Sequence, residues 1–194
     1  SSLAAVLAGG APELFLGKLQ DLASVGFYSR ANGLVQMFYR LVIDAVGVVC
    51  LPWFSKRSRE DGTISEPFLK ATAYVSAVGW FFCIILICQA YSIVRILYGS
   101  QWGDSVDLVK ILALATAIGV PASLCHVALL SIGAVNTIAL LTVFGALVTV
   151  PLVAFAAFHG AIAVSFSAVA ISLIMASVSL VVTSKHIGFP LLNL

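Results

Sequence analysis

Six long apolar segments, separated by short polar stretches, run along the chain. A transmembrane helix needs about 20 consecutive, predominantly apolar residues, and each segment is long enough to meet that requirement. The segments are residues 3–22, 25–51, 68–98, 105–130, 136–158 and 161–183. The pattern predicts an all-α, polytopic transmembrane helix bundle of about six helices.

Prolines and glycines predict where these helices bend or end. Pro12 and Pro121 lie inside apolar segments, where proline removes a helical hydrogen bond and kinks the helix. Pro52 is expected to end the second helix, because the residue before a proline is driven away from helical geometry. Gly99 is expected to end the third helix, and Asp104 stands at the N-cap position of a fourth helix that begins directly after it.

The composition supports the membrane class. Hydrophobic residues make up 61% of the chain and charged residues 9%, whereas a soluble domain carries about 25% charged residues. Residues 111–184 contain no Asp, Glu, Lys or Arg, which leaves no place there for a domain that faces water. The net charge of +2 is too small and too dispersed for a nucleic-acid partner, which requires a concentrated basic face.

The basic residues predict the orientation. The polar stretch 53–67 carries the basic run Lys56 to Arg59, and such runs are retained on the cytoplasmic side. Counting crossings then places the loops near residues 21, 99–104 and 159 outside, and those near 133–136 and 185 inside. Because the chain begins in apolar sequence without a signal peptide, it is expected to be a piece of a longer protein.

A stripe of polar residues interrupts the second apolar segment. It consists of Tyr28, Asn32, Gln36, Arg40 and Asp44, spaced four apart, and we call it the polar stripe. On a regular helix, residues four apart drift by about 40°, so the stripe should wind slowly around the helix. Arg40 would lie about 16 Å from Leu51, near the middle of a bilayer.

Charges at that depth are costly and indicate a function. Two interpretations of Arg40 and Asp44 remain open, an intrahelical ion pair and the lining of a hydrated transport cavity. Glu13, which follows Pro12, faces the same cavity or reaches local water beside the kink. Arg30 is either a cavity residue or an anchor at the membrane interface.

Known catalytic and metal-binding motifs are missing from the sequence. It has no GxSxG elbow, no HExxH helix and no phosphate-binding glycine loop, so we expect a protein that is not an enzyme, without cofactor or bound metal. The four cysteines, all in or beside apolar segments, are expected to be reduced packing residues. His126, alone on its helix, is expected to be a hydrogen-bonded packing residue, with a proton relay as the alternative.

Several stretches together resemble one known family. "LFLGKLQDLASVGFYSRANGLVQMF" resembles the start of the second half of polysaccharide flippases, and "VVCLPWFSKRSREDG" followed by "EPFLKA" resembles the next helix end and turn. "VRILYGSQWGDSVDLVKILAL" is similar to the family's Tyr-Gly-x-x-Trp loop, and "LLSIGAVNT" and "FHGAIAVSFS" resemble its last turns. The family is the polysaccharide transporter branch of the multidrug, oligosaccharidyl-lipid and polysaccharide exporter superfamily. The chain departs from it at Val135 and Asn136, where a basic residue is common.

The resemblance implies one lobe, residues 1–194, of a two-lobe exporter in the bacterial inner membrane. Such a transporter moves a polyprenyl-pyrophosphate-linked oligosaccharide between leaflets by alternating access, driven by a proton or sodium gradient. Arg40 would attract the anionic headgroup, and Asp44 would orient the Arg40 side chain. Asn32 and Gln36 would form hydrogen bonds with sugar hydroxyls, and Arg30 would act as an outer relay. Asp44 or Glu13 would bind the coupling ion.

The expected partners are the lipid-linked oligosaccharide, membrane lipid, the missing N-terminal lobe, and a polysaccharide polymerase or glycosyltransferase. Two alternatives remain at this point. One is a multidrug or small-cation exporter of the same superfamily, whose cavity would depend on acidic residues. The other is a non-transporting membrane scaffold for polysaccharide assembly, in which the charges form a dry ion pair.

Overall fold

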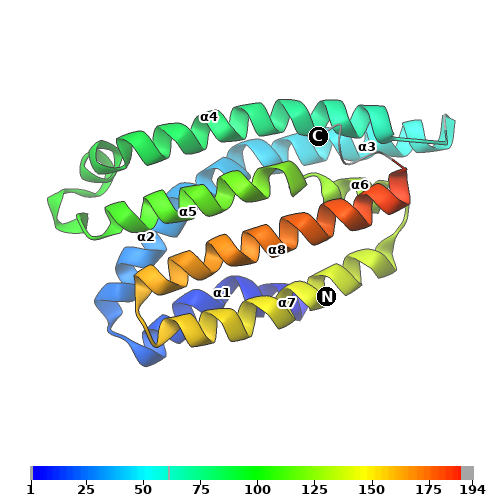
Figure 1. Cartoon of the computed structure of the whole chain (residues 1–194). Helices are drawn as coiled ribbons and strands as arrows, with labels where there is room; N and C mark the ends of the chain where they lie inside the picture. The colour runs from blue at the N-terminus through cyan, green and yellow to red at the C-terminus, as the bar shows by residue number, and fades with distance from the viewer. Residues whose placement is uncertain (1, 61, 189–194) are drawn as a thin grey trace.

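The computed structural model of the protein describes residues 2–60 and 62–188, and within these ranges it contains helices and no strand. The α-helices are α1 (Ser2–Leu19), α2 (Leu22–Phe38), α3 (Asp44–Glu60), α4 (Ser65–Tyr98), α5 (Ser105–Gly119), α6 (Cys125–Ser131), α7 (Val135–Ala157) and α8 (Ala161–Ile187). Three short turns complete them: a π-helical turn η1 (Tyr39–Ile43) and the 3-10 turns η2 (Ser100–Trp102) and η3 (Val120–Ala122). The predicted all-α polytopic bundle is confirmed (Figure 1).

Five helical segments of the described residues are long and apolar enough to cross a membrane. They are Leu22–Glu60, Ser65–Tyr98, Ser105–Ser131, Val135–Ala157 and Ala161–Ile187. α1 covers the first predicted segment as a helix but is not among these five. The protein is therefore a multi-pass membrane protein, as its apolar pattern predicts.

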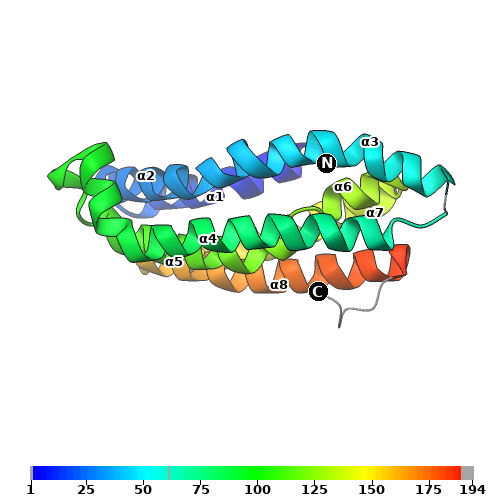
Figure 2. The same ribbon diagram turned by 90° about the horizontal axis from the view of Figure 1, so that it is seen from above.

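The helices pack in two layers, and α5 makes contacts with both of them. α5 contacts α2, α4 and α8, and α1 packs against α7. Figure 2 shows α1, α2 and α3 on one side and α4, α5 and α8 on the other. α2 packs against α1 and the central helix α5, which places the first three residues of the polar stripe, Tyr28, Asn32 and Gln36, between these helices.

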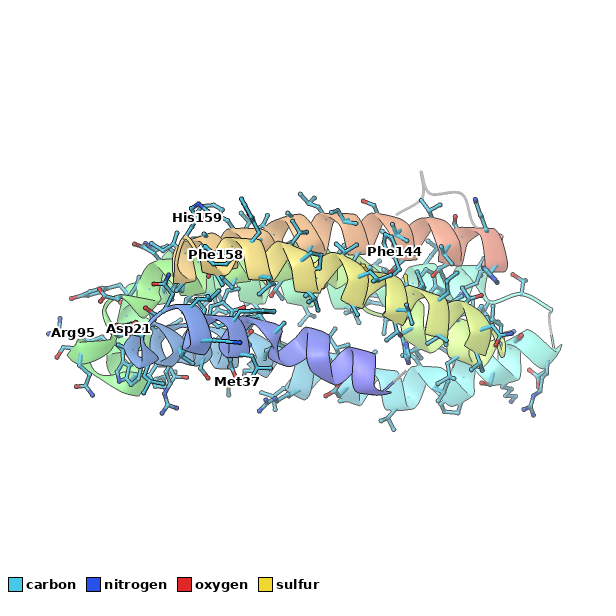
Figure 3. All side chains as sticks on the ribbon, turned by 90° about the horizontal axis from the view of Figure 1, so that it is seen from below. Asp21, Met37, Arg95, Phe144, Phe158 and His159 are labelled. Atoms are coloured by element: carbon cyan, nitrogen blue, oxygen red, sulfur yellow. The ribbon has the colours of Figure 1, made fainter. Side chains whose placement is uncertain are left out.

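The connections alternate between the two ends of the bundle. Asp21 and His159 line one pocket, and Figure 3 shows both at the same end as Arg95. At the opposite end the Ser65 hydroxyl donates a hydrogen bond of 3.0 Å to the Ile187 carbonyl. This grouping of the loops agrees with the predicted order of crossings.

The prediction that the second helix ends at Pro52 is wrong. The helix continues through Pro52 as α3 and ends at Glu60, so most of the stretch predicted as a loop is helical. Cys50 and Phe54 flank the proline and are both buried, and the Phe54 ring lies 6.4 Å from that of Phe68 on α4. The burial of Cys50 and Phe54 on either side of Pro52 outweighs the preference of the residue before a proline for non-helical geometry.

Other predicted helix boundaries are partly confirmed. α4 ends at Gly99, whose φ of 95° favours glycine, and α5 begins directly after Asp104. The Asp104 side chain nevertheless makes no cap hydrogen bond, because its residue already has helical geometry. A side-chain cap does form at the start of α2, where the Asp21 carboxylate accepts the Ser24 N–H at 2.9 Å. Hydrogen bonds from the Ser24 side chain and backbone hold the pKa of Asp21 below its usual range.

The two prolines predicted to kink helices have different effects. α1 continues as an α-helix through Pro12, whereas at Pro121 the α-helix gives way to the 3-10 turn η3. Pro121 has no N–H to give to the carbonyl four residues before it, that of Ala117. The indole N–H of Trp80 on α4 donates to this carbonyl at 3.0 Å. A side chain from a neighbouring helix therefore satisfies the group that the proline leaves open.

We expect Trp80→Phe to lower the free energy of unfolding by about 1 kcal/mol, because it leaves the Ala117 carbonyl without a donor in an apolar setting. In a Pro121→Ala background the restored N–H can serve Ala117, so the same substitution should cost less. Thermal unfolding of the four variants of the full-length protein measures this coupling. Equal losses in both backgrounds would contradict the role assigned to Trp80.

All four cysteines are free, and Cys50, Cys83 and Cys125 are buried, as predicted for packing residues. Cys88 is exposed on α4. His126 differs from its predicted role: it is exposed, and no hydrogen bond to it occurs in the described part of the chain. It lines a pocket that α6 shares with residues of α7 and α8.

Candidate functional site

A cavity of about 330 Å³ lies between α1, α2, α5 and α8, and we call it the α2 cavity. Three residues of the polar stripe line it from α2: Tyr28, Asn32 and Gln36. The other lining residues are Gly9, Pro12, Val35, Leu112, Ala115, Thr116, Ala168 and Ser172. Its volume falls within the range of small-molecule sites, roughly 300–1,000 Å³.

The spacing along α2 and the size of the facing residues together produce this cavity. Residues four apart share a helix face, so the stripe points one way while Ala31 and Leu34 are buried in the core. The stripe faces Gly9, Ala115 and Ala168, and a Cβ built on Gly9 would meet no atom within 4 Å. Small residues opposite the stripe therefore leave open space where larger side chains would interdigitate.

The cavity wall offers hydrogen bonds without formal charge. Tyr28 is 4% exposed and brings a phenol, while Asn32 and Gln36 are half-buried and bring amides that both donate and accept. The Thr116 hydroxyl lies on the facing wall and donates to the Leu112 carbonyl at 2.9 Å. Such a surface suits uncharged polar groups, and hydroxyls in particular.

Arg40 and Asp44 continue the stripe beyond the cavity. They do not line it, and both side chains are exposed. Arg40 lies inside η1, about 27 Å along the helix from Leu22 and about 30 Å from Glu60. It therefore stays in the middle of the crossing although the helix is longer than predicted. Within the described residues no ion pair joins Arg40 to Asp44.

The π-helical turn changes the direction of the stripe. On a regular helix, Asp44 would have drifted by about 160° from Tyr28 and would face almost the opposite side. A π turn takes in one extra residue, which rotates everything after it back by about 100°. Asp44 then lies about 60° from Tyr28, between the directions of Asn32 and Gln36. The winding band predicted from the spacing is thus brought back to one side of the helix.

Arg30 lies apart from the cavity, in an aromatic cluster. Its guanidinium stacks over the rings of Tyr98 at 5.7 Å and Trp102 at 5.4 Å. The Trp102 ring also meets that of Phe27 edge-on at 5.6 Å. The Ser105 hydroxyl donates to the Phe27 carbonyl at 3.1 Å, so η2 and the start of α5 are fastened to α2. This arrangement is that of an anchor at the helix end.

Glu13 lies beside the cavity. It is exposed on α1, next to Pro12, which lines the cavity. Glu13 thus places a carboxyl group at the α1 edge of the α2 cavity.

Sequence reasoning missed the residues that α5 and α8 contribute to the site. Thr116 and Ser172 carry hydroxyls in segments whose small residues indicate close helix packing, and no spacing rule links them to α2. The pairing of Arg30 with Tyr98 and Trp102 was also not predicted. Arg95, close to both in sequence, donates instead to the Tyr91 hydroxyl at 3.1 Å. Arg30 could be paired with Tyr98 and Trp102 only once it was known that α2 packs against the C-terminal end of α4.

The described residues contain no group of three or more His, Cys, Asp or Glu that could hold a metal ion. A family model described as a polysaccharide biosynthesis protein matches residues 1–107, which include α1 to α4 and the whole polar stripe. Comparisons with curated proteins and with solved structures find no match.

Proposed function

The chain belongs to the polysaccharide biosynthesis protein family, and from that premise we propose that it is one lobe of a transporter in the bacterial inner membrane. The transporter moves a polyprenyl-pyrophosphate-linked oligosaccharide from the inner to the outer leaflet. One observation carries the proposal: a polar cavity between apolar helices, lined by Tyr28, Asn32 and Gln36, with Arg40 and Asp44 exposed beyond it on the same continuous helix.

The chemistry of the stripe suits the two polar parts of this substrate. Sugar hydroxyls both donate and accept hydrogen bonds, as do the amides of Asn32 and Gln36. A pyrophosphate is anionic, and a guanidinium binds phosphate oxygens through two parallel hydrogen bonds. Arg40 follows Gln36 by one turn, so sugar and pyrophosphate can be bound side by side along one helix. The lipid tail remains in the bilayer.

Movement across the membrane requires a second, facing lobe and a source of energy. Arg40 and Asp44 are exposed, and in the proposed transporter the facing lobe lies across the path from them. Rocking of the two lobes opens the cavity to each side in turn. A proton or sodium gradient drives the cycle, with Asp44 or Glu13 binding the ion, and a polymerase or glycosyltransferase acts on the same glycolipid.

Cysteine scanning of the full-length protein tests the proposal. Single cysteines at residues 28, 32, 36, 40 and 44 should react with a water-soluble thiol reagent, because the stripe faces a hydrated path. Cysteines at Leu34, which is buried, and at Leu41, which is exposed but points away from the stripe, should stay unlabelled and serve as controls. The native cysteines are first replaced, since Cys88 is exposed.

The pattern distinguishes the proposal from its alternatives. Labelling confined to the stripe supports a hydrated path. A cysteine at Gln36 that resists the reagent indicates a dry interior and favours the scaffold. Labelling at residue 36 but not at residue 44 would contradict the realignment by η1.

A further inference from the structure

A second polar site lies at the charged end of the bundle, far from the α2 cavity. It is a groove of about 170 Å³ between the last turns of α3 and the first turns of α4, and we call it the α3–α4 groove. Its lining residues are Trp53, Arg57, Thr63, Glu66, Pro67 and Lys70. None of them belongs to the polar stripe, so the groove has no part in the proposed transport path.

The groove combines charges of both signs. Arg57 comes from α3, and Glu66 and Lys70 come from α4, where their side chains form an ion pair of 2.6 Å. Both partners of the pair are more than half exposed, and exposed ion pairs contribute little free energy. A ligand that carries an anionic and a cationic group can therefore open the pair and replace each partner.

The groove lies at the depth of lipid headgroups. Val49 on α3 is 69% exposed and apolar, Trp53 follows one turn later at 40% exposure, and Arg57 follows after another turn. An apolar residue, an interfacial tryptophan and a cation in that order mark the passage from hydrocarbon to headgroups. This order exists because α3 continues as a helix through Pro52.

The start of α4 adds a partial positive charge, because the first turn of a helix is the positive end of its dipole. The N–H groups of Ser65 and Phe68 are already bonded within the protein, and Pro67 has none. Thr63 lines the groove directly before this turn, and its hydroxyl accepts the Ser65 N–H at 3.3 Å. The Ser65 hydroxyl fastens this end to the Ile187 carbonyl, so the groove is built on a fixed helix start.

We propose that the α3–α4 groove binds the headgroup of a membrane phospholipid that carries a primary ammonium, phosphatidylethanolamine. Arg57 and Lys70 bind its phosphate and Glu66 accepts hydrogen bonds from its ammonium, while the acyl chains lie along Trp53 and Val49. A choline headgroup has no N–H to donate to Glu66, and a glycerol headgroup has no cation.

Native mass spectrometry of the full-length protein, purified from an equal mixture of phosphatidylethanolamine, phosphatidylcholine and phosphatidylglycerol, tests this site. We expect the ethanolamine lipid to be retained preferentially. Glu66→Gln should lower that preference roughly tenfold, because one charge-assisted contact is lost. Lys70→Gln should weaken retention of all three lipids.

Glu60→Gln is the matched control. Glu60 pairs with Lys56 at 3.8 Å with the same spacing and similar exposure, yet neither residue lines the groove. It should leave lipid retention unchanged. The proposal would be overturned if the three lipids were retained equally or if the glycerol lipid were preferred. It would also be overturned if Glu66→Gln and Glu60→Gln had equal effects on lipid retention. Because all these side chains are exposed, thermal unfolding should be unaffected, and a large loss of stability would likewise count against a binding role.

Discussion

Replacing Arg40 with alanine in the full-length protein is expected to reduce export of the lipid-linked oligosaccharide by about 30- to 1,000-fold. This corresponds to about 2–4 kcal/mol, the usual cost of removing one partner of a desolvated charge pair. Arg40 lies in the middle of the 39-residue helix Leu22–Glu60, where its charge is costly unless it meets an anion or water. Export of labelled glycolipid from vesicles measures the effect.

Two further substitutions sharpen this result. Arg40→Lys keeps the charge but loses the planar fork, so export should fall by less. Arg95→Ala is the control, since Arg95 is exposed in the last turn of α4 and donates to the Tyr91 hydroxyl. Unchanged export by Arg40→Ala would remove Arg40 from the path. Improved export of organic cations by Arg40→Glu would favour the cation exporter instead.

Deleting Leu41 should leave the protein folded, whereas deleting Val48 should unfold it. η1 takes in one extra residue, so removal of Leu41 converts the turn to regular helix and keeps the faces of α2 and α3 in place. Removal of Val48 instead rotates the rest of α3 by about 100°. Phe54 then leaves the core, and losing a buried phenylalanine alone costs about 3–5 kcal/mol.

Gel filtration and thermal unfolding of the two full-length variants check this contrast. Leu41 and Val48 are matched, because both are apolar, exposed and on the same continuous helix. If both deletions unfold the protein, the π turn does not absorb a residue and the realignment of Asp44 is wrong. If both are tolerated, the packing of Phe54 against Phe68 does not hold α3 in position.

The prediction succeeded where lipid or helix geometry alone decides the outcome. The six apolar segments became helices because unpaired backbone groups cannot be left in hydrocarbon, so each segment must satisfy them internally. Gly99 ended α4 because its φ of 95° is strained for other residues. Tyr28, Asn32 and Gln36 share a cavity because residues four apart share a helix face.

The prediction failed where a distant contact, or the backbone geometry of the residue itself, competes with a local preference. At Pro52 the local rule predicts an end, but burial of Cys50 and Phe54 keeps the helix intact. At Asp104 a capping side chain was available and was not used. Arg30 was drawn to two aromatic residues that lie about 70 positions away in the chain, beyond the reach of any local pattern.

By itself the sequence determined the membrane class, the helical segments and a helix that carries polar groups on one side. These features depend on hydrophobicity and on the 3.6-residue repeat, which are properties of each segment alone. Only the tertiary structure decided that the polar stripe faces Gly9, Ala115 and Ala168 across an open space. It also decided that η1 returns Asp44 to the side of Gln36. Both depend on which helices pack together, because a cavity or a π turn exists only relative to its neighbours.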